Sequence, residues 1–98
     1  MPRVGQARKR DANEKAIVEA LEHVGAAVFR LNGAGIPDLL VAYRGDWLPM
    51  EVKSAHGKLT ARQAETLFRA GPIPIVRSVA EALALLGIPM NIGGMDGS

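Results

Sequence analysis

The centre of the chain contains a pair of strand signals that constrains the fold more than any other feature. Residues 39–43 (Leu-Leu-Val-Ala-Tyr) form a near-continuous apolar run, typical of a strand buried on both faces in the centre of an α/β sheet. A short turn at residues 44–46 (Arg-Gly-Asp) separates this run from a second strand pattern at residues 47–54. Because the turn is so short, we expect the two strands to pair in antiparallel fashion.

Helix and strand patterns continue on both sides of this hairpin. Residues 11–25 place apolar side chains at helical spacing, with Asp11 as the cap and Gly25 as the end. The remaining predicted elements are a strand at 26–31, a helix at 60–70, a strand at 73–77 and a helix that begins after Ser78 and ends at Gly87. The order α-β-β-β-α-β-α indicates an α/β fold with one mixed sheet flanked by helices.

Length and composition narrow the class of protein. The 98 residues fit one domain, which we assign to residues 11–87, between a basic arm at 1–10 and a tail rich in Gly and Met at 88–98. The chain has no cysteine, which excludes disulfides and thiolate metal sites. His23 and His56 lack the companions of a zinc site. Without a signal-peptide or membrane-spanning pattern, the sequence predicts an intracellular, cytoplasmic protein.

The strand at 47–54 carries two charged side chains on one face. Leu48, Met50 and Val52 share one face and are typical of a core. Glu51 and Lys53 share the other, roughly 6.6 Å apart along the strand. Charges on a covered strand need a partner or a metal ion. The alternative is an ordinary Glu–Lys pair on a half-exposed strand.

Asp38 favours the metal interpretation. It directly precedes the apolar strand, about as far before the turn as Glu51 lies after it, so we expect the two carboxylates to lie opposite each other. Cross-strand neighbours have Cβ atoms about 4.5–5.5 Å apart. Two carboxylates that close repel unless a cation lies between them, and oxygen ligands point to Mg²⁺ or Mn²⁺. Alone, Asp38 would be explained by an Asx turn that opens a strand.

Two further polar residues have two interpretations each. Glu14 falls in line with the buried stripe of Ile17 and Leu21, which suggests a further metal ligand, but it also has capping-box spacing from Asp11. Gln63 has the same spacing from Thr60, so it either serves the site or is only a helix cap.

Three other features of the sequence bear on the site and its surroundings. Lys58 and Arg62 either hold phosphates or are ordinary surface charges, and the same holds for Arg8, Lys9 and Arg10 in the arm. Pro49 lies within the charged strand, where a proline suggests an edge or a bulge.

These residues together resemble a known family. Pro37-Asp38 followed by Glu51-Val52-Lys53 resembles the PD-(D/E)XK nuclease superfamily. The longer match, residues 35–41, then 51–53, then Lys58-Leu59-Thr60-x-x-Gln63, is similar to its VRR-NUC branch, and the helix with Glu14 is similar to that of Holliday junction resolvases. The resemblance covers about residues 11–80 and implies a restriction-endonuclease-like sheet.

The resemblance also implies roles for individual residues. Asp38 and Glu51 would bind the catalytic metal with the backbone carbonyl of Val52, and Lys53 would stabilise the attacking water and the phosphate. Glu14 would be the acid carried by the first helix, and Gln63 the glutamine of the second. The candidates for further DNA contacts rest on their charge and not on the resemblance, and they are Lys58, Arg62, Arg8, Lys9 and Arg10.

The expected function is therefore a metal-dependent endonuclease that hydrolyses DNA, in a homodimer acting on branched DNA such as Holliday junctions. The apolar residues near the end of the chain either build the dimer interface or are disordered, and they are Ile88, Met90, Ile92 and Met95. The alternative is a nuclease-fold module that binds DNA or a partner without cutting. The three charged residues Asp38, Glu51 and Lys53 favour the enzyme, because an inactive copy has no chemical need to keep all of them.

Overall fold

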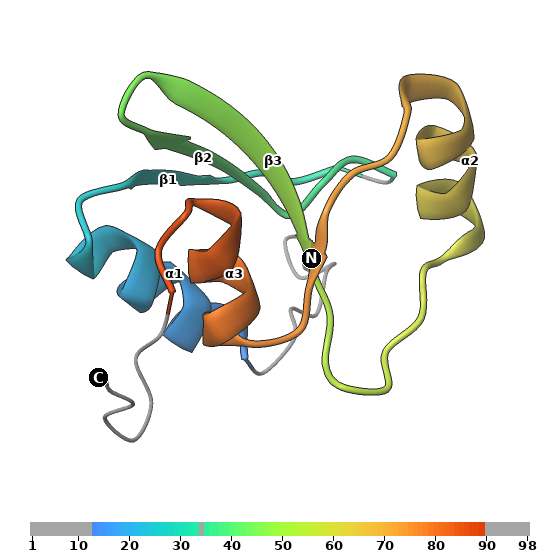
Figure 1. Cartoon of the computed structure of the whole chain (residues 1–98). Coiled ribbons are helices and arrows are strands. Elements are labelled where there is room, and N and C mark those ends of the chain that lie inside the picture. Colours follow the sequence, from blue (N-terminus) through green and yellow to red (C-terminus); the bar gives the residue numbers. More distant parts are fainter. Residues whose placement is uncertain (1–12, 34, 90–98) are drawn as a thin grey trace, which may run out of the picture.

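A computed structural model describes residues 13–33 and 35–89 of the chain. Seven elements follow one another in the predicted order (Figure 1): α1 (Glu14–His23), β1 (Ala27–Arg30), β2 (Leu39–Tyr43), β3 (Asp46–Val52), α2 (Ala61–Ala70), β4 (Ile75–Val76) and α3 (Val79–Leu85). The strands form one sheet in the order β1-β2-β3-β4, antiparallel except for the parallel pair β3–β4. The α/β class and the mixed sheet are therefore confirmed.

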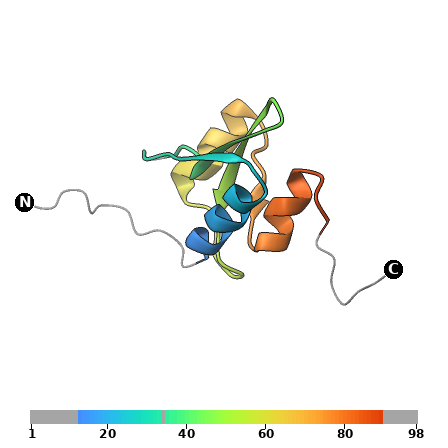
Figure 2. The same cartoon turned by 90° about the vertical axis from the view of Figure 1, so that its left-hand side faces the viewer.

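The hydrophobic core lies between one face of the sheet and the helices α1 and α3. Those two helices pack side by side against that face (Figures 1 and 2). The core residues with no more than 1% exposure are Ile17 and Leu21 from α1, Leu39 and Val41 from β2, Met50 and Val52 from β3, Val76 from β4 and Ala82 from α3. The alternating pattern of β3 thus buries the face that was predicted to be core.

The opposite face of the sheet is covered only in part. Figure 1 shows α2 beside the carboxyl end of β3, whereas the β2–β3 hairpin extends away from this helix. Leu40 and Ala42 of β2 point to this face and are only half-buried. The prediction that β2 is buried on both faces is therefore wrong for one face. In α2, Ala64 is exposed and Gln63 is buried.

Pro49 lies on the free side of β3, as an edge position requires. Strand β4 pairs with β3 only at Glu51 and Val52. The N–H groups of Glu51 and Lys53 donate to carbonyls of the β4 segment, at 2.8 and 3.0 Å. Because backbone direction repeats every second residue, residue 49 faces the same side, before β4 begins. A proline there removes no ladder hydrogen bond.

The structure can be compared with the sequence prediction at the N-terminus of each of the three helices. Thr60 and Gln63 form a full capping box, with Gln63 N–H donating to Thr60 Oγ1 at 3.1 Å and Thr60 N–H to Gln63 Oε1 at 2.9 Å. Ser78 Oγ accepts from the N–H of Glu81 and caps α3. The box predicted for Glu14 is wrong, because Asn13 occupies the N-cap position and Glu14 is the first helical residue. Asp11 lies outside the described residues.

The two ends of the chain are described only in part. The arm at 1–10 and residues 90–98 of the tail lie outside the described residues, and so do Met90, Ile92 and Met95 of the predicted interface. Ile88 packs against the protein's own core, and its N–H donates to the carbonyl of Leu83 at 3.0 Å. Within the described residues, no helix is long and apolar enough to span a membrane.

Candidate active site

Two carboxylates meet where strands β2 and β3 run side by side. The antiparallel register pairs Leu39 with Met50, and its next step sets Asp38 opposite Glu51. The backbone of Asp38 faces β1, because its carbonyl accepts from Leu31, and the backbone of Glu51 faces β4. The pair is therefore of the non-hydrogen-bonded type, in which the side chains come closest. Both residues are buried, at 6% and 4% exposure. The expected juxtaposition of the two acids is what the structure has.

The surroundings of Glu51 raise the pKa of its carboxyl group. Burial is the main cause, followed by the neighbouring charge of Asp38, and together they raise the pKa of Glu51 to about 7. Lys53 opposes this shift, because its ammonium favours the charged form. Lys53 Nζ lies 3.4 Å from Glu51 Oε2, and its side chain is 14% exposed. At neutral pH the carboxyl of Glu51 is therefore present in both its protonated and its ionised form, and a bound cation would favour the ionised form.

Hydrogen bonds fix both carboxylates in place. Val52 N–H donates to Asp38 Oδ2 at 2.9 Å, so the strand that carries Glu51 also orients Asp38. Gln63 of α2 donates from Nε2 to Glu51 Oε2. The sequence left open whether Gln63 caps a helix or serves the site. In the structure its Oε1 caps α2 and its Nε2 contacts Glu51, so it does both.

A narrow cleft opens beside Glu51 and Gln63. Its other lining residues come from the loop before Asp38, from the segment before α2 and from the β4 segment, namely Gly35, Ile36, Pro37, Leu59, Ile73 and Ile75. Gly35 has a φ of +82° and packs tightly on α2, because a Cβ there would lie 3.3 Å from the carbonyl of Arg62 and 3.0 Å from Thr66 Oγ1. The glycine thus lets the loop before Asp38 approach the helix that carries Gln63.

Glu14 is buried at 3% exposure but has a different neighbour from the one predicted. Its Oε2 lies 3.3 Å from Nε of Arg30 in β1. Within residues 13–33 and 35–89, no three His, Asp or Glu side chains gather as a possible metal site. The structure therefore brings together Asp38, Glu51, Lys53 and Gln63 and leaves Glu14 paired with an arginine.

Two residues that support this site were missed at the sequence level. Asn13 Nδ2 donates to the carbonyls of Lys53 and Arg77, at 3.1 and 3.0 Å, and so ties the ends of the parallel strands together. Arg77 Nη1 donates to the carbonyls of Ser54 and Gly57, at 2.6 and 2.8 Å, and holds the loop after Lys53. An asparagine before a helix is usually interpreted as a helix cap, so no sequence pattern indicated the contacts of Asn13 with Lys53 and Arg77.

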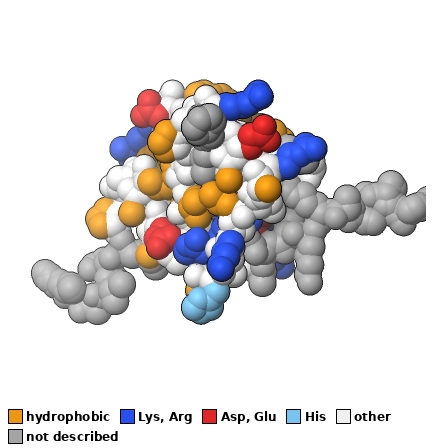
Figure 3. Space-filling model, turned by 90° about the vertical axis from the view of Figure 1, so that its right-hand side faces the viewer, with side chains coloured by type: hydrophobic (Ala, Val, Ile, Leu, Met, Phe, Trp, Pro, Cys, Tyr) orange, Lys and Arg blue, Asp and Glu red, His pale blue; other side chains and the backbone are white. Residues whose placement is uncertain are grey.

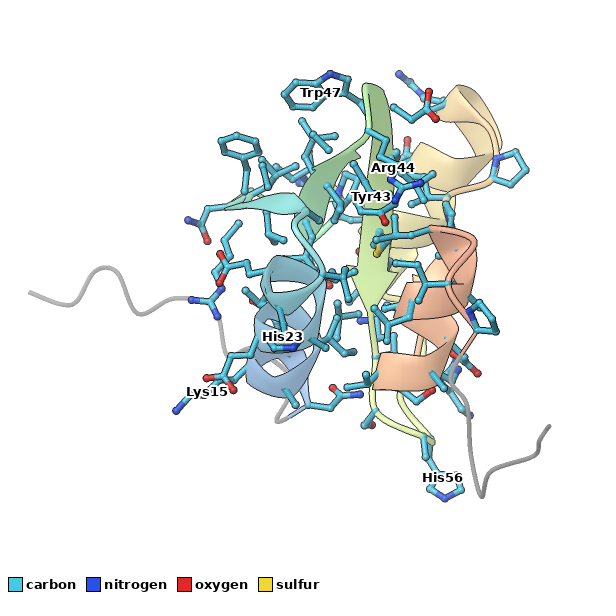
Figure 4. All side chains as sticks on the ribbon, turned by 60° about the vertical axis from the view of Figure 1, so that its left-hand side comes forward. Lys15, His23, Tyr43, Arg44, Trp47 and His56 are labelled. Atoms are coloured by element: carbon cyan, nitrogen blue, oxygen red, sulfur yellow. The ribbon has the colours of Figure 1, made fainter. Side chains whose placement is uncertain are left out.

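The residues expected to contact DNA surround the site only in part. Lys58 and Arg62 are exposed, on the loop before α2 and on its first turn. Figure 3, viewed from the side on which α2 lies, shows lysine and arginine side chains around a group of apolar ones. His56 lies at the tip of the loop after β3 (Figure 4). Arg8, Lys9 and Arg10 lie outside the described residues.

The donor set fits a hard divalent cation. Asp38 and Glu51 supply carboxylate oxygens, and the like charge of Asp38 already raises the pKa of Glu51, which a cation would relieve. The register also sets Val52 opposite Pro37, which has no N–H to donate to the carbonyl of Val52. Pro37 therefore does not use that oxygen, and an oxygen-only donor set suits Mg²⁺ or Mn²⁺.

The fold is thus a four-stranded mixed sheet with two acids and a lysine where β2 and β3 pair. Comparison with known proteins specifies it further. A solved structure titled "VRR_NUC domain" is similar over 76% of this chain and 89% of that one, with a TM-score of 0.59 and 28% sequence identity. No family model and no curated protein matched the chain. The chain thus has the fold of a VRR-NUC nuclease domain, and the resemblance drawn from its sequence is confirmed.

Proposed function

We propose that this protein is a metal-dependent endonuclease that hydrolyses DNA phosphodiester bonds, with Asp38, Glu51 and Lys53 as its catalytic residues. The observation that carries the proposal is the buried, cross-strand pair of carboxylates with the Lys53 ammonium beside it, 3.4 Å from Glu51. Charges gathered in this way are costly without a cation or substrate to balance them. Their place in a nuclease fold supports phosphodiester hydrolysis over an accidental cluster.

The metal in this proposal is Mg²⁺ or Mn²⁺, held by Asp38, Glu51 and the carbonyl of Val52. When bound, such an ion lowers the pKa of a water molecule and polarises the phosphate. Lys53 supplies the positive charge that stabilises the charge developing on the phosphate oxygens. Gln63 fixes the carboxylate of Glu51, and Val52 N–H fixes that of Asp38. Glu14 stays outside this set in the proposal, because its carboxylate is paired with Arg30.

The substrate in the proposal is branched DNA, such as a Holliday junction, and the enzyme is a homodimer. Two copies related by a two-fold axis would present two sites to two strands, whereas one short chain has little surface to hold a junction. Lys58, Arg62 and the basic arm with Arg8, Lys9 and Arg10 would contact phosphates. Sedimentation that shows only monomers at micromolar concentration, with and without DNA, would contradict the dimer.

The decisive experiment compares cleavage of a labelled four-way junction with that of a matching linear duplex, in Mg²⁺, Mn²⁺ or EDTA. We expect metal-dependent nicks in the junction, lost in Glu51→Gln and reduced at least a hundredfold in Lys53→Met. The control variant is Lys15→Met, which removes an exposed lysine from α1. Cutting in EDTA, or cutting by Lys53→Met at the wild-type rate, would contradict the assignment.

The alternative is a nuclease-fold module that binds DNA without cutting it. This alternative predicts retention of the junction on a gel with no cleavage in any metal. Equal cutting of junction and duplex would keep the nuclease and discard the selectivity for branches.

A further inference from the structure

Two exposed aromatic rings lie on the uncovered face of the sheet. Phe29 of β1 and Trp47 of β3 are 48% and 60% exposed. Their rings stack, with centroids 5.8 Å apart and planes inclined by 15°. The strand between them is β2, on which Phe29 pairs with Leu40 and Trp47 with Ala42. Figure 4 shows Trp47 at the opposite end of the molecule from His56, away from helices α1 and α3.

This aromatic pair shares its face of the sheet with the proposed catalytic residues. Cross-strand partners lie on the same face, and every second residue of a strand returns to it. Trp47 and Glu51 are four residues apart in β3, on the face opposite the core residues Met50 and Val52. Four residues of strand span about 13 Å, the length of a few nucleotides. A DNA strand that is cut beside Glu51 and runs along β3 would therefore pass close to the two rings.

The chemistry of this face suits a strand with accessible bases better than a second protein. The neighbours of the rings on this face are Ala27, Leu40, Ala42 and Pro49, and the last three are half-buried. Among the described residues of β1, β2 and β3, the two rings are the only large apolar side chains that are exposed. Lys53 follows β3 at the other end of this face, and the exposed Lys58 and Arg62 lie on the loop before α2 and on its first turn. Cations that follow the phosphates and aromatic rings that stack on bases are the two parts of a single-strand binding surface.

We propose that Phe29 and Trp47 form a stacking platform for unpaired bases of the DNA strand whose phosphate lies at Asp38 and Glu51. The inference rests on the proposed nuclease function and gives it a substrate class, DNA with unpaired bases within a few nucleotides of the cut. Bases inside a duplex are stacked on their neighbours, so their faces are not available to the rings. Open bases at a branch, a flap or a single-stranded end are available.

The single tryptophan of the chain reports directly on this contact. The experiment titrates a twelve-nucleotide oligothymidylate into the protein in EDTA and follows the fluorescence of Trp47. We expect the fluorescence to be quenched on binding. An abasic oligonucleotide of the same length carries the same phosphates without bases, so it should bind more weakly and leave the fluorescence unchanged. Equal affinity and equal quenching for the two would overturn the platform.

Variants separate stacking from charge. Measured by anisotropy of a labelled oligonucleotide, Trp47→Ala should lose about fivefold to a hundredfold in affinity, because it removes a ring on which a base stacks. Its salt dependence should stay as in the wild type, since no phosphate contact is removed. Trp47→Phe should keep most of the affinity. The matched control is Leu85→Ala, which removes an apolar side chain that is 41% exposed on α3. Unchanged affinity in Trp47→Ala would contradict the proposal.

The same variants distinguish the stacking platform from a contact between two copies of the chain. They also test the platform separately from the proposed nuclease activity. If Trp47→Ala turns a sedimenting dimer into monomers and leaves the affinity per site unchanged, the rings form a contact between copies, and the platform is wrong. Because binding is measured in EDTA, its result does not depend on cleavage. The platform can fail while metal-dependent cutting stands, and cutting can fail while the stacking is still observed.

Discussion

Gln63 links the start of helix α2 to the carboxylate of Glu51. Its Oε1 accepts from the N–H of Thr60 at 2.9 Å, and its Nε2 donates to Glu51. One side chain therefore sets both where the helix begins and how a proposed metal ligand is oriented. The two contacts use different atoms, so substitutions can remove one and keep the other.

We expect Gln63→Glu to keep the helix cap and impair the site. A glutamate can still accept from Thr60, as in many capping boxes, but it cannot donate to Glu51 while it is ionised. The metal-free protein should lose about 1–3 kcal/mol in the free energy of unfolding, because a carboxylate replaces the donor to the buried Glu51. The metal affinity should differ at least tenfold from that of the wild type, because the charge beside Glu51 changes. Gln63→Ala should lose both contacts, so that both the cap of α2 and the orientation of Glu51 are lost. Calorimetric titration with Mn²⁺ and urea unfolding measure the two effects, and equal metal affinity in Gln63→Glu and the wild type would contradict the linkage.

The raised pKa of Glu51 makes the stability of the metal-free protein depend on pH. The folded state holds this proton up to a pH of about 7, whereas an unfolded glutamate releases it near 4.5. The folded state is therefore favoured at low pH, and this contribution is lost as the pH rises from about 4.5 through about 7. Above that window the group disfavours folding by up to about 3 kcal/mol.

Urea unfolding in EDTA at pH 5.5 and 8.0 tests this behaviour. Between these two values the wild type should lose more stability than Glu51→Gln, whose amide does not titrate. Mn²⁺ should bind more tightly as the pH rises toward about 7, because the cation replaces the proton. Glu22→Gln, which removes an exposed glutamate of α1, is the control. Parallel pH profiles for wild type and Glu51→Gln would show that Glu51 has an ordinary pKa.

The strand pairing of the site could be predicted from the sequence, because it follows from the hairpin alone. A turn of fixed length between two strand patterns determines which residues lie opposite each other, and this placed Asp38 across from Glu51. The capping box at Thr60 also follows from local spacing. The contact from Gln63 to Glu51 could be expected only through the family resemblance, since the two lie on separate elements.

Features that depend on distant packing could not be predicted. The partner of Glu14 is Arg30, on a neighbouring strand, and helical periodicity shows that a residue is buried but not what it contacts. The open sheet face also went unpredicted, because an apolar run in β2 cannot show that α2 covers only one end of the sheet. Phe29 and Trp47 are eighteen residues apart, and only the pairing through β2 brings them together.

Asn13 is expected to be a structural anchor of the Lys53 segment. Its Nδ2 donates to the carbonyls of Lys53 and Arg77, and Asn13→Asp replaces this donor with an acceptor. We expect a loss of about 2–3 kcal/mol in the free energy of unfolding, because two carbonyls lose their donor and face a charge. Thermal and urea unfolding measure it, with Lys15→Ala as the neighbouring surface control. A stability within about 0.5 kcal/mol of wild type would show that these bonds contribute little.

Gly35 is expected to be the residue that allows the loop before Asp38 to approach α2. Gly35→Ala meets two obstacles, a φ of +82° that an L side chain rarely adopts and a Cβ 3.3 Å from the carbonyl of Arg62. We expect a cost of about 1–3 kcal/mol in stability, because either the backbone is strained or the loop moves off the helix. If the loop moves, the cleft beside Glu51 and Gln63 opens, and cleavage falls further than stability predicts. The control is Gly45→Ala in the hairpin turn, where φ is +87° and no atom lies within 4 Å of the added Cβ. A backbone penalty alone would make the two variants equal in stability and in cleavage, whereas contact with α2 predicts a larger loss of both for Gly35→Ala.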